Sequence, residues 1–273
     1  MSGGADSSAL LLLAVAAGLH VTAVHVDHGL RPGSSAEADV VRATAQRFGA
    51  DFRSARVDLT DGPNLEERAR EARLAVLPPD SMTGHTADDQ AETVLVNLLR
   101  GAGTRGLSAM RPGHRRPLLA LRRADTVALC TAFDVHLVHD PSNLDPRHLR
   151  NRVRHELLPL MADLAHRDVA TLLARQADLA RDESDLLDAL ATALDPTDAK
   201  ALAAAPAPLA RRAIRRWLTT THPPDAATVE RVLAVARGHA AGTDVGSGRR
   251  VERSRQRLSL VSPQAPTNPA GNE

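Results

Sequence analysis

The sequence predicts an α/β fold, a parallel sheet with helices on both faces, followed by a mainly helical C-terminal domain. Residues 1–140 alternate helical and strand-like patterns, whereas the chain after Pro159 is rich in Ala and Leu. A hydrophobic fraction of 43% over 273 residues is enough for one ordinary domain and a smaller one beside it. These observations exclude a wholly disordered chain.

The first half of the chain contains short elements separated by turns. Residues 7–18 are apolar and rich in Leu and Ala, which is typical of a helix, whereas HVTAVHV at residues 20–26 is β-branched and predicts a buried strand. Asn64 with Glu67 three residues later marks another helix start. The predicted helices cover residues 7–18, 34–48, 64–77, 87–99 and 124–133, and the predicted strands cover residues 20–26, 52–57, 81–84 and 135–138.

The second half is predicted to be helical up to a terminal hairpin. The helices cover residues 168–194, 206–219 and 224–237, and residues 243–251 and 255–261 pair as two strands. The last residues are rich in Pro, Asn and Gly, which predicts disorder. We therefore expect an N-terminal domain at residues 1–160, a helical domain at 161–262 and a disordered tail at 263–273.

Charge is balanced overall but uneven along the chain. The formal net charge is +1, and Lys200 is the only lysine. Residues 206–261 hold 11 Arg against four acidic residues, a local excess of 11 − 4 = 7. This excess predicts either a surface that binds a polyanion such as RNA or an ordinary solvated face of helices and hairpin, and composition alone leaves both open.

Several classes of protein are excluded at this stage. The single Cys130 rules out an intramolecular disulfide and a zinc or iron–sulfur site built from cysteines. The apolar run at residues 9–19 is too short to span a bilayer and lacks the flanks of a signal peptide. We therefore expect a cytoplasmic protein without a membrane partner.

The chain opens with a loop suited to phosphate. Ser2-Gly3-Gly4-Ala5-Asp6-Ser7-Ser8 leads directly into an apolar helix. Glycines let the backbone approach an anion, and the helix start offers free N–H groups with partial positive charge. The alternative is a flexible start in which Asp6 or Ser7 is a simple helix cap. The GxxxxGK[ST] loop of P-loop kinases is excluded because the segment has no lysine.

Acidic residues and histidines follow two of the predicted strands. His25, Asp27 and His28 end the first strand, and His85, Asp88, Asp89 and Glu92 begin the helix after another strand. Ligands of open α/β sheets bind at the carboxyl ends of the strands. Acids at a helix start suit either the helix dipole or Mg²⁺ bound to ATP, and each histidine alone is more often structural.

The segment SGGADS at residues 2–7 resembles the SGGxDS signature of PP-loop ATP pyrophosphatases, a Rossmann-like class that cleaves ATP between its α- and β-phosphates and adenylates a substrate. Further segments follow in the order found in the tRNA(Ile)-lysidine synthetase family and resemble it. These are VDHGLRP (26–32), NLEERAREAR (64–73), TGHTADDQAETVL (83–95), RGAGTRGLSAM (100–110), RPLL (116–119) and SNLDPRHLRNRVRHELLP (142–159). Residues 243–261 resemble the end of that family's substrate-binding region.

The resemblance implies a ligase that modifies tRNA. Such enzymes use ATP to adenylate the C2 oxygen of the wobble cytidine in the isoleucine tRNA with a CAU anticodon. The amine of free lysine then attacks C2, forms lysidine and expels AMP. ATP with Mg²⁺ is therefore the expected cofactor, this tRNA and lysine are the expected partners, and a homodimer is possible in such a family.

The resemblance also implies roles for individual residues. Asp27 is expected to accept the proton of the attacking lysine, while His85, Asp89 and Glu92 complete the catalytic site, with Asp27 and Asp89 as candidate Mg²⁺ ligands. The residues expected to hold ATP are Ser2, Gly3, Gly4, Ala5, Asp6, Ser7, Arg70 and Arg73. The residues expected to meet tRNA or ATP are Arg147, Arg150, Asn151, Arg152 and Arg154.

One feature departs from the family pattern. Members of the tRNA(Ile)-lysidine synthetase family have a hydrophobic strand immediately before SGGxDS, whereas in this sequence only Met1 precedes Ser2. We therefore expect the first, central strand to be missing, with its natural start upstream, and the activity of the chain is an open question. A missing central strand exposes two strand edges.

Three alternatives remain at the sequence level. A tRNA thiolase would use the same ATP chemistry but relies on cysteines. A metal-dependent phosphoesterase could be built from His25, Asp27, His28, His85 and the neighbouring acids. A non-catalytic nucleotide- or tRNA-binding remnant would fit a missing strand.

Overall fold

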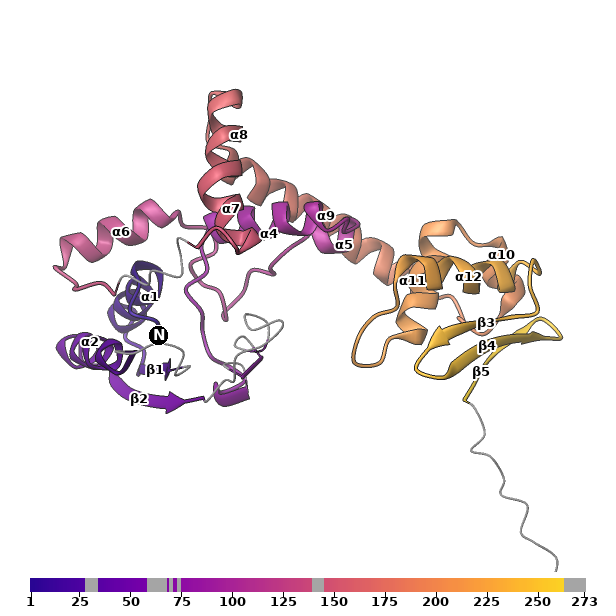
Figure 1. The fold of residues 1–273 in the computed structure, drawn as a ribbon, viewed down its shortest axis with the longest axis horizontal. Helices are drawn as coiled ribbons and strands as arrows, with labels where there is room; N and C mark the ends of the chain where they lie inside the picture. Colours follow the sequence, from indigo (N-terminus) through magenta and orange to yellow (C-terminus); the bar gives the residue numbers. More distant parts are fainter. Residues whose placement is uncertain (28–33, 58–67, 69–70, 73–74, 139–144, 263–273) are drawn as a thin grey trace, which may run out of the picture. The chain divides into compact units, whose positions relative to one another are not determined.

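The computed structural model describes residues 1–27, 34–57, 68, 71–72, 75–138 and 145–262 (Figure 1). The chain forms two compact units, Met1–Arg181 and Asp182–Glu273. The predicted helix at residues 64–77 lies largely outside the described residues, as do His28, Arg70 and Arg73. The domain boundary near residue 160 stays a prediction.

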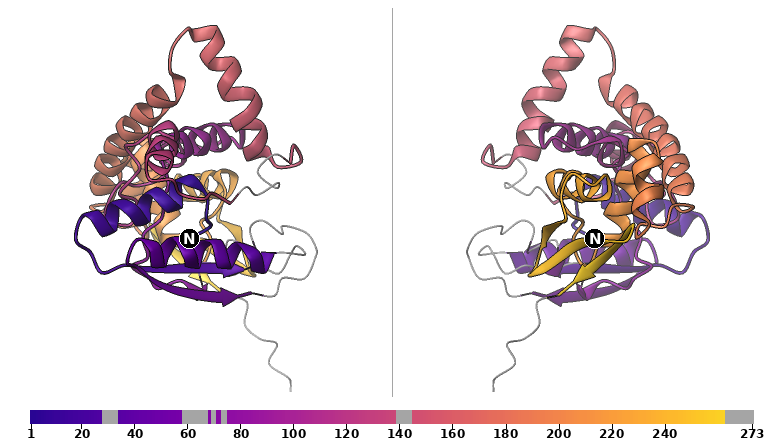
Figure 2. Two further views of the ribbon diagram at one scale, coloured as in Figure 1. Left: turned by 90° about the vertical axis from the view of Figure 1, so that its left-hand side faces the viewer. Right: turned by 90° about the vertical axis from the view of Figure 1, so that its right-hand side faces the viewer.

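The N-terminal unit is built on a parallel strand pair. Strands β1 (Thr22–Asp27) and β2 (Asp51–Arg56) pair from Thr22↔Asp51 to Asp27↔Arg56. Helix α2 (Ser34–Arg47) connects them and packs on both (Figures 1 and 2). The two strands and α2 confirm the α/β prediction, because a crossover helix is what joins parallel neighbours.

The first residues of the chain lie beside β1. The terminal amine of Met1 donates to the Val24 carbonyl, and His25 Nδ1 lies 3.0 Å from the Met1 carbonyl oxygen. On the other side, the Val138 N–H donates to the Gly3 carbonyl at 3.0 Å. Residues 1–3 therefore lie between β1 and the segment 135–138 and deliver the chain to helix α1 (Ala5–Ala16).

Two predicted strands are wrong. Residues 81–84 and 135–138 are described but form no strand. A strand needs a ladder of consecutive backbone pairs. The backbone hydrogen bond of Val138 to Gly3 and that of Thr83 to the Arg115 carbonyl, 2.8 Å long, are single contacts rather than ladders.

Helices α4 and α6 complete the frame around the first loop. Helix α6 (Arg123–Ala132) packs on α1, with Ala9, Leu118 and Cys130 buried between them. Helix α4 (Ala87–Leu99) is followed by the single-turn helix α5 (Thr104–Leu107). Both longer helices confirm their predicted ranges to within one residue at each end.

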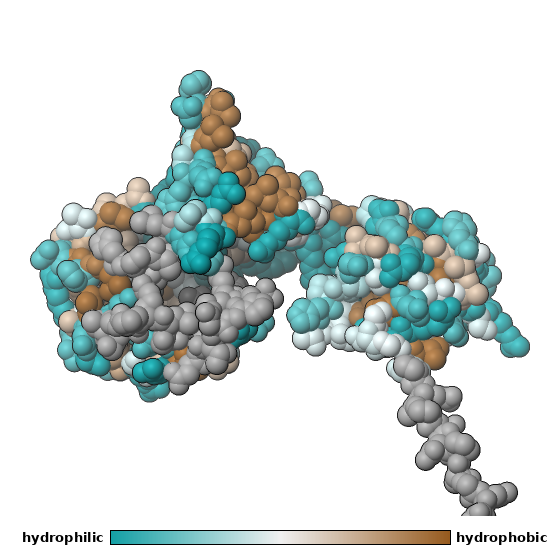
Figure 3. All heavy atoms as spheres, in the orientation of Figure 1, coloured by the Kyte–Doolittle hydropathy of each residue, from teal (hydrophilic) through white to brown (hydrophobic). Residues whose placement is uncertain are grey.

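The basic run at residues 147–157 is helical from Leu149 onward. Helix α7 (Leu149–Arg152) continues through a π-helical turn, Val153–Leu157, into α8 (Leu158–Ala165), and α7 contacts α4. His166, at φ 50°, ends α8, and α9 (Val169–Ala191) begins three residues later. Figure 2 shows α8 and the start of α9 as a helical hairpin. Leu160 and Leu164 stay exposed on α8, where Figure 3 shows a hydrophobic surface.

The C-terminal unit is built around an aliphatic core. Helices α10 (Ala199–Ala204), α11 (Ala207–Leu218) and α12 (Ala226–Ala236) pack with an antiparallel sheet of β3 (Gly242–Gly246), β4 (Arg249–Ser254) and β5 (Arg257–Val261). The buried residues include Leu202, Ile214, Leu233 and Val251. The helices predicted at residues 206–219 and 224–237 are confirmed as α11 and α12.

The predicted two-stranded hairpin is a three-stranded meander instead. Residues 243–251 do not form one strand, because a tight turn interrupts them at Gly246-Ser247-Gly248, all three with positive φ. Such a turn requires left-handed backbone, and glycine at two of the three positions removes most of its steric cost. Within the described part of the chain, no helix is both long and apolar enough to cross a membrane.

Candidate active site

The loop before α1 closes on itself and leaves the helix start open. Ser7 Oγ donates to the Gly4 carbonyl at 3.0 Å and lies 3.2 Å from Ser2 Oγ. Gly4 is the N-cap and supplies no side-chain acceptor to the first turn of α1. The N–H groups of that turn therefore suit an anion, as the sequence predicted for Ser2 to Ser7.

Two glycines are required by close packing at this loop. Gly3 has φ 79°, and a Cβ there would lie 2.6 Å from Val138 Cγ2. A Cβ on Gly84 would lie 2.5 Å from the carbonyl oxygen of Asp6. Gly84 thus lets the segment that carries His85 lie directly against the loop. The sequence analysis quoted Gly84 only as part of a motif and gave it no role.

The first turn of α4 presents two buried carboxylates. Asp89 closes a capping box, accepting from the Thr86 N–H at 2.9 Å and from Thr86 Oγ1 at 3.2 Å through one oxygen. Glu92 lies one turn later and is 1% exposed, against 7% for Asp89. Buried carboxylates are costly unless they are paired. Their partners are three arginines from two other helical segments.

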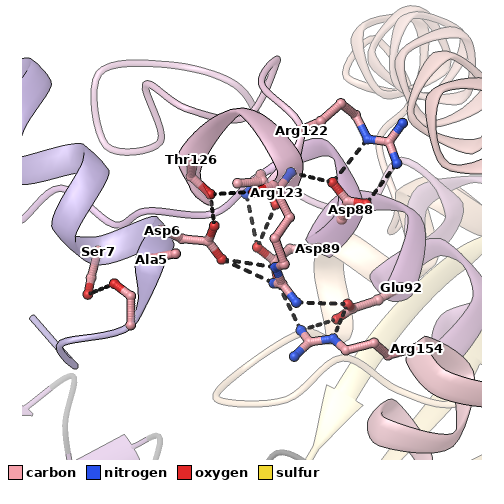
Figure 4. A network of polar contacts seen from close by, with 12 residues as sticks. Ala5, Asp6, Ser7, Asp88, Asp89, Glu92, Arg122, Arg123, Thr126 and Arg154 are labelled. Carbon is pink, nitrogen blue, oxygen red and sulfur yellow. Dashed lines mark hydrogen bonds and ion pairs between the residues drawn. The ribbon is translucent and has the colours of Figure 1, made fainter. Parts of the chain in front are cut away.

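Arg123, at the first turn of α6, joins the loop to α4. Its Nη2 lies 3.1 Å from Asp6 Oδ2 and 3.2 Å from Asp89 Oδ1 (Figure 4). Thr126 Oγ1, from the same helix, donates to Asp6 Oδ1 at 2.6 Å. Arg123 was not among the predicted site residues. A signal was available, because a cation in the first turn of a helix opposes the helix dipole and needs another reason to be there.

Two arginines of the α7 segment complete the set. Arg150 donates to Glu92 Oε2 at 2.8 Å and to Asp89 Oδ1 at 3.1 Å. Arg154 binds both oxygens of Glu92, at 2.5 and 2.8 Å. Their spacing of four residues puts them on one face of a helix. Asp6, Asp89 and Glu92 with Arg123, Arg150 and Arg154 form what we call the acid–arginine cluster, whose formal charge is 3 − 3 = 0.

The other residues expected to meet tRNA or ATP lie elsewhere. Arg147 is exposed and paired with Asp145 at 2.6 Å, and Arg152 is paired with Glu156 at 3.0 Å. The Asn151 side-chain amide donates to the Asp145 carbonyl at 2.9 Å. Only Arg150 and Arg154 of the five enter the acid–arginine cluster.

Asp88, next to this cluster, is held by a different arginine. Arg122 binds both of its oxygens, at 2.8 and 3.0 Å, and the Arg123 N–H donates to it at 2.7 Å. Arg122 also contacts Asp168 at the start of α9. Asp88 therefore fixes the start of α6 against α4 and sets the position of Arg123.

The carboxyl groups differ in their pKa values. Burial raises the pKa of Asp6 above its ordinary value, more than the hydrogen bond of Thr126 and the charge of Arg123 lower it. Burial also acts to raise the pKa of Asp89, but Arg123, the Thr86 N–H and Arg150 together hold it below its ordinary value. Asp89 is thus a stable anion, and Asp6 is the carboxyl group that takes up a proton more readily.

Asp27 ends β1 as predicted, whereas His85 follows a segment that forms no strand. His85 Nδ1 lies 2.8 Å from Thr83 Oγ1, and its charge contributes to the lowered pKa of Asp89. Asp27 is half-buried at the carboxyl end of β1. Its role as a base and its role as a metal ligand stay predictions.

The arrangement does not fit Mg²⁺ held by Asp89. One oxygen of Asp89 accepts from Thr86 and the other from arginines, so both already have hydrogen-bond donors, and the arginines would repel a cation. Among the described residues, no group of three His, Cys, Asp or Glu is placed to hold a metal ion. The phosphoesterase alternative therefore finds no ligand set in that part of the chain.

Cys130 is placed as a core residue. It is 1% exposed, and its Sγ lies 3.4 Å from the Ala5 carbonyl, to which the thiol donates. Burial, with the nearby Asp6 charge, raises the pKa of the thiol. A reactive or metal-binding cysteine needs a lowered pKa and access, so this position does not support thiolase chemistry.

Comparison with known proteins identifies both parts of the chain. Residues 1–161 match the family described as PP-loop domain, and residues 198–259 match the TilS substrate binding domain. The chain is 44% identical over 234 residues to the tRNA(Ile)-lysidine synthase of Nocardia farcinica, covering 80% of this chain and 74% of that one. It is 45% identical over 236 residues to the enzyme of Mycolicibacterium paratuberculosis, with coverages of 80% and 72%.

A solved structure supports the fold. The U34-tRNA thiolase NcsA of Methanococcus maripaludis, with its [4Fe-4S] cluster, aligns with a TM-score of 0.53 at 16% identity and covers 66% of this chain and 71% of its own. At this identity the likeness concerns the fold alone. The predicted PP-loop fold with a helical C-terminal region is confirmed.

Proposed function

Because the chain belongs to the tRNA(Ile)-lysidine synthase family, we propose that it ligates free lysine to C2 of the wobble cytidine in the CAU-anticodon isoleucine tRNA. The reaction class, an ATP-dependent modification of tRNA, follows from the family. The finer claims, which are the lysine substrate, Mg²⁺ and the residue roles, rest on the site described above. Such a reaction belongs in the cytoplasm, where ATP, lysine and tRNA meet.

The acid–arginine cluster is the observation that carries the proposal. Three carboxylates and three arginines neutralise one another beside an open helix start. Phosphate groups would attract the arginines, and each arginine drawn toward phosphate would leave carboxylate charge for another cation. A site that binds an anion and an ammonium group together is what ATP and lysine require.

In this proposal ATP lies at the start of α1. Its phosphates face the backbone and hydroxyl groups of Ser2 to Ser7, with Arg123 close by through its contact to Asp6. Arg70 and Arg73 are further candidates for phosphate contact. Mg²⁺ would be carried mainly by the phosphate oxygens, with Asp27 as the candidate protein ligand, because Mg²⁺ binds ATP sites through few carboxylates.

Lysine lies at the start of α4. The carboxylates of Asp89 and Glu92 would take its ammonium charge once the arginines turn toward phosphate, and His85 lies at the edge of the site. The cytosine C2 oxygen is a poor leaving group until it carries AMP. Asp27 would accept the proton that the attacking amine must lose.

The tRNA would reach the site from the basic surfaces. Arg147, Arg152 and the arginines of residues 206–261 are exposed or half-exposed and are candidates for its phosphates. A homodimer remains an expectation, which light scattering of the purified protein decides.

The experiment is transfer of labelled lysine to tRNA with ATP and Mg²⁺. We expect incorporation into the isoleucine tRNA with a CAU anticodon, none into elongator methionine tRNA, and loss of incorporation in Asp27→Asn. Normal single-turnover incorporation by Asp27→Asn would refute its role as the base. Absence of incorporation by the unchanged chain, with tRNA and ATP still bound, would favour a non-catalytic remnant.

A further inference from the structure

An uncommonly long stretch of the N-terminal unit carries only positive charge. No Asp or Glu occurs between Glu92 and Asp125, an interval of 125 − 92 − 1 = 32 residues and the longest in a chain with 33 acidic residues. The next longest, between Asp198 and Asp225, is 26 residues. The arginines of the stretch are Arg100, Arg105, Arg111, Arg115, Arg116, Arg122 and Arg123.

The last two arginines of the stretch bind carboxylates, whereas several of the earlier ones are exposed. Arg122 and Arg123 bind the carboxylates of the α4 start. Arg100, Arg105 and Arg115 are exposed, and their guanidinium groups make no hydrogen bond or ion pair with the described residues. Exposed cations in a segment that contains no acidic residue create a positive surface potential that attracts polyanions.

Buried polar side chains hold the backbone of this segment in place. Gln90, 2% exposed, donates to the Met110 carbonyl at 3.0 Å and accepts from the Met110 N–H at 3.0 Å. Arg181, 7% exposed, donates to the carbonyls of Ser108 and Met110 at 2.9 and 2.8 Å. Asn97 donates to the Gly106 carbonyl at 2.7 Å. The segment 100–115 is therefore a fixed platform for its exposed arginines.

The platform runs from the edge of the acid–arginine cluster along α4. At the near end, the Arg115 carbonyl accepts from Thr83, whose hydroxyl lies 2.8 Å from His85 Nδ1. At the far end, Arg100 follows Asp89 by 11 helical residues, a distance of about 16 Å along the axis at about 1.5 Å per residue. A nucleic-acid strand that lies along this line would place several of its phosphates beside these arginines.

We propose that residues 100–115 form a phosphate-binding surface for the tRNA strand next to the target cytidine, on the catalytic unit itself. The segment contains no Phe, Tyr or Trp, so it lacks the large aromatic side chains on which bases usually stack. It would hold the backbone and position the nucleotide without reading sequence. The inference rests on the proposed function only in taking tRNA as the substrate.

The test compares two triple variants of the full chain that remove the same charge. R100Q/R105Q/R115Q removes the exposed arginines of the platform. R53Q/R167Q/R175Q removes three other exposed arginines of the same unit, none in contact with a carboxylate of the described residues. Binding of the CAU-anticodon isoleucine tRNA and of its anticodon stem–loop is measured by fluorescence anisotropy over a series of salt concentrations, after thermal unfolding has shown that both variants fold.

We expect the platform triple to weaken tRNA binding about tenfold or more at moderate salt and to reduce the slope of log K against log salt by about 2 to 3, with a smaller loss in the control. The same loss should appear with the stem–loop. A slope reduced by less than about 1 relative to the control triple would overturn the proposal. Lysine incorporation by the unchanged chain is measured in parallel, so a failure of the proposed function is seen separately.

Discussion

The two units of the chain use burial for different purposes. In the C-terminal unit, 14 buried apolar residues form one cluster, and the buried polar residues described there are Ser184 and Thr228. The N-terminal unit also buries apolar side chains, but at the start of α4 it buries polar groups as well, where Thr86, Asp89, Gln90 and Glu92 are each 7% exposed or less. Aliphatic burial stabilises a fold, whereas buried charges are costly and are kept where chemistry needs them.

Because of this difference, we expect substitutions in the C-terminal unit to affect mainly folding and substitutions at the start of α4 to affect mainly the reaction. A truncated side chain in the α11–α12 core should unfold its unit without touching the site. A neutralised carboxylate at the α4 start should abolish the reaction and leave the C-terminal unit folded. Trp217, the single tryptophan, packs against the C-terminal core, so its fluorescence reports on that unit alone.

The largest effect on activity is expected for Glu92→Gln. Glu92 is 1% exposed and bound by Arg150 and Arg154, so its neutralisation leaves these two arginines with Asp89 as their one carboxylate in the contacts described, a change that costs about 3–5 kcal/mol. We expect kcat/KM for lysine incorporation to fall about 100-fold or more. Glu156→Gln, which removes an exposed carboxylate paired only with Arg152 in the contacts described, is the matched control and should change it less than about twofold. Equal losses in both would contradict the assignment.

In the other unit, Leu233→Ala should lower the free energy of unfolding by about 2–5 kcal/mol. Leu233 is 1% exposed, and its truncation leaves a cavity in the apolar cluster of the C-terminal unit. Urea unfolding followed by Trp217 fluorescence measures it. Leu190→Ala, at a position 51% exposed, is the control and should stay within about 0.5 kcal/mol of the unchanged chain. A change below about 1 kcal/mol for Leu233→Ala would show that this core does not hold the unit together.

Lowering the pH should change the stability of the N-terminal unit through two carboxyl groups with opposite effects. The pKa of Asp89 is lowered in the folded state, so its contribution to stability is present above its ordinary pKa of 3.8 and is lost as the pH falls below that value. The pKa of Asp6 is raised, so protonation of Asp6 favours the folded state as the pH falls toward 3.8. We expect Asp89→Asn to lose less stability than the unchanged chain when the pH falls below about 4. We expect Asp6→Asn to lack the stability that the unchanged chain gains as the pH falls toward about 4 from higher values. Urea unfolding followed by circular dichroism as a function of pH checks both, and unchanged pH profiles would contradict the pKa directions.

The smallest effect is expected for Cys130→Ala. The thiol is buried against α1 and makes one weak hydrogen bond, so its loss should cost about 1 kcal/mol and leave lysine incorporation within about twofold. Thermal unfolding and the incorporation assay measure the two quantities. A folded Cys130→Ala protein without activity would revive the thiolase alternative.

Local patterns predicted the elements but not every pairing. The helices predicted at residues 87–99 and 206–219 are found as α4 and α11 at nearly the same bounds. Residues 135–138 have a β-branched, apolar pattern, but a strand also depends on its neighbour, and local sequence does not reveal that their backbone contact is Gly3. The turn at residues 246–248 was overlooked, although its two glycines signalled it.

The site was predicted in part, for a similar reason. Motifs near strand ends identified Asp6, His85, Asp89 and Glu92, which are brought to one region. Arg123 was missed because its role comes from the packing of α6 on α1 and its contact with Asp88, which join positions more than 30 residues apart. Arg147 and Arg152 share a motif with Arg150 and Arg154, but Arg147 precedes the start of α7 at Leu149, and Arg152 pairs with Glu156 one turn later.

The most direct test separates the two half-reactions. ATP labelled in its α-phosphate is mixed with the CAU-anticodon isoleucine tRNA and no lysine, and lysine is then added. The account predicts labelled AMP attached to the tRNA in the first stage and its rapid release by lysine in the second, with Glu92→Gln stopping before release. If the unchanged chain attaches no AMP to the tRNA, or if Glu92→Gln releases it with lysine at the unchanged rate, the acid–arginine cluster is not the centre of this reaction.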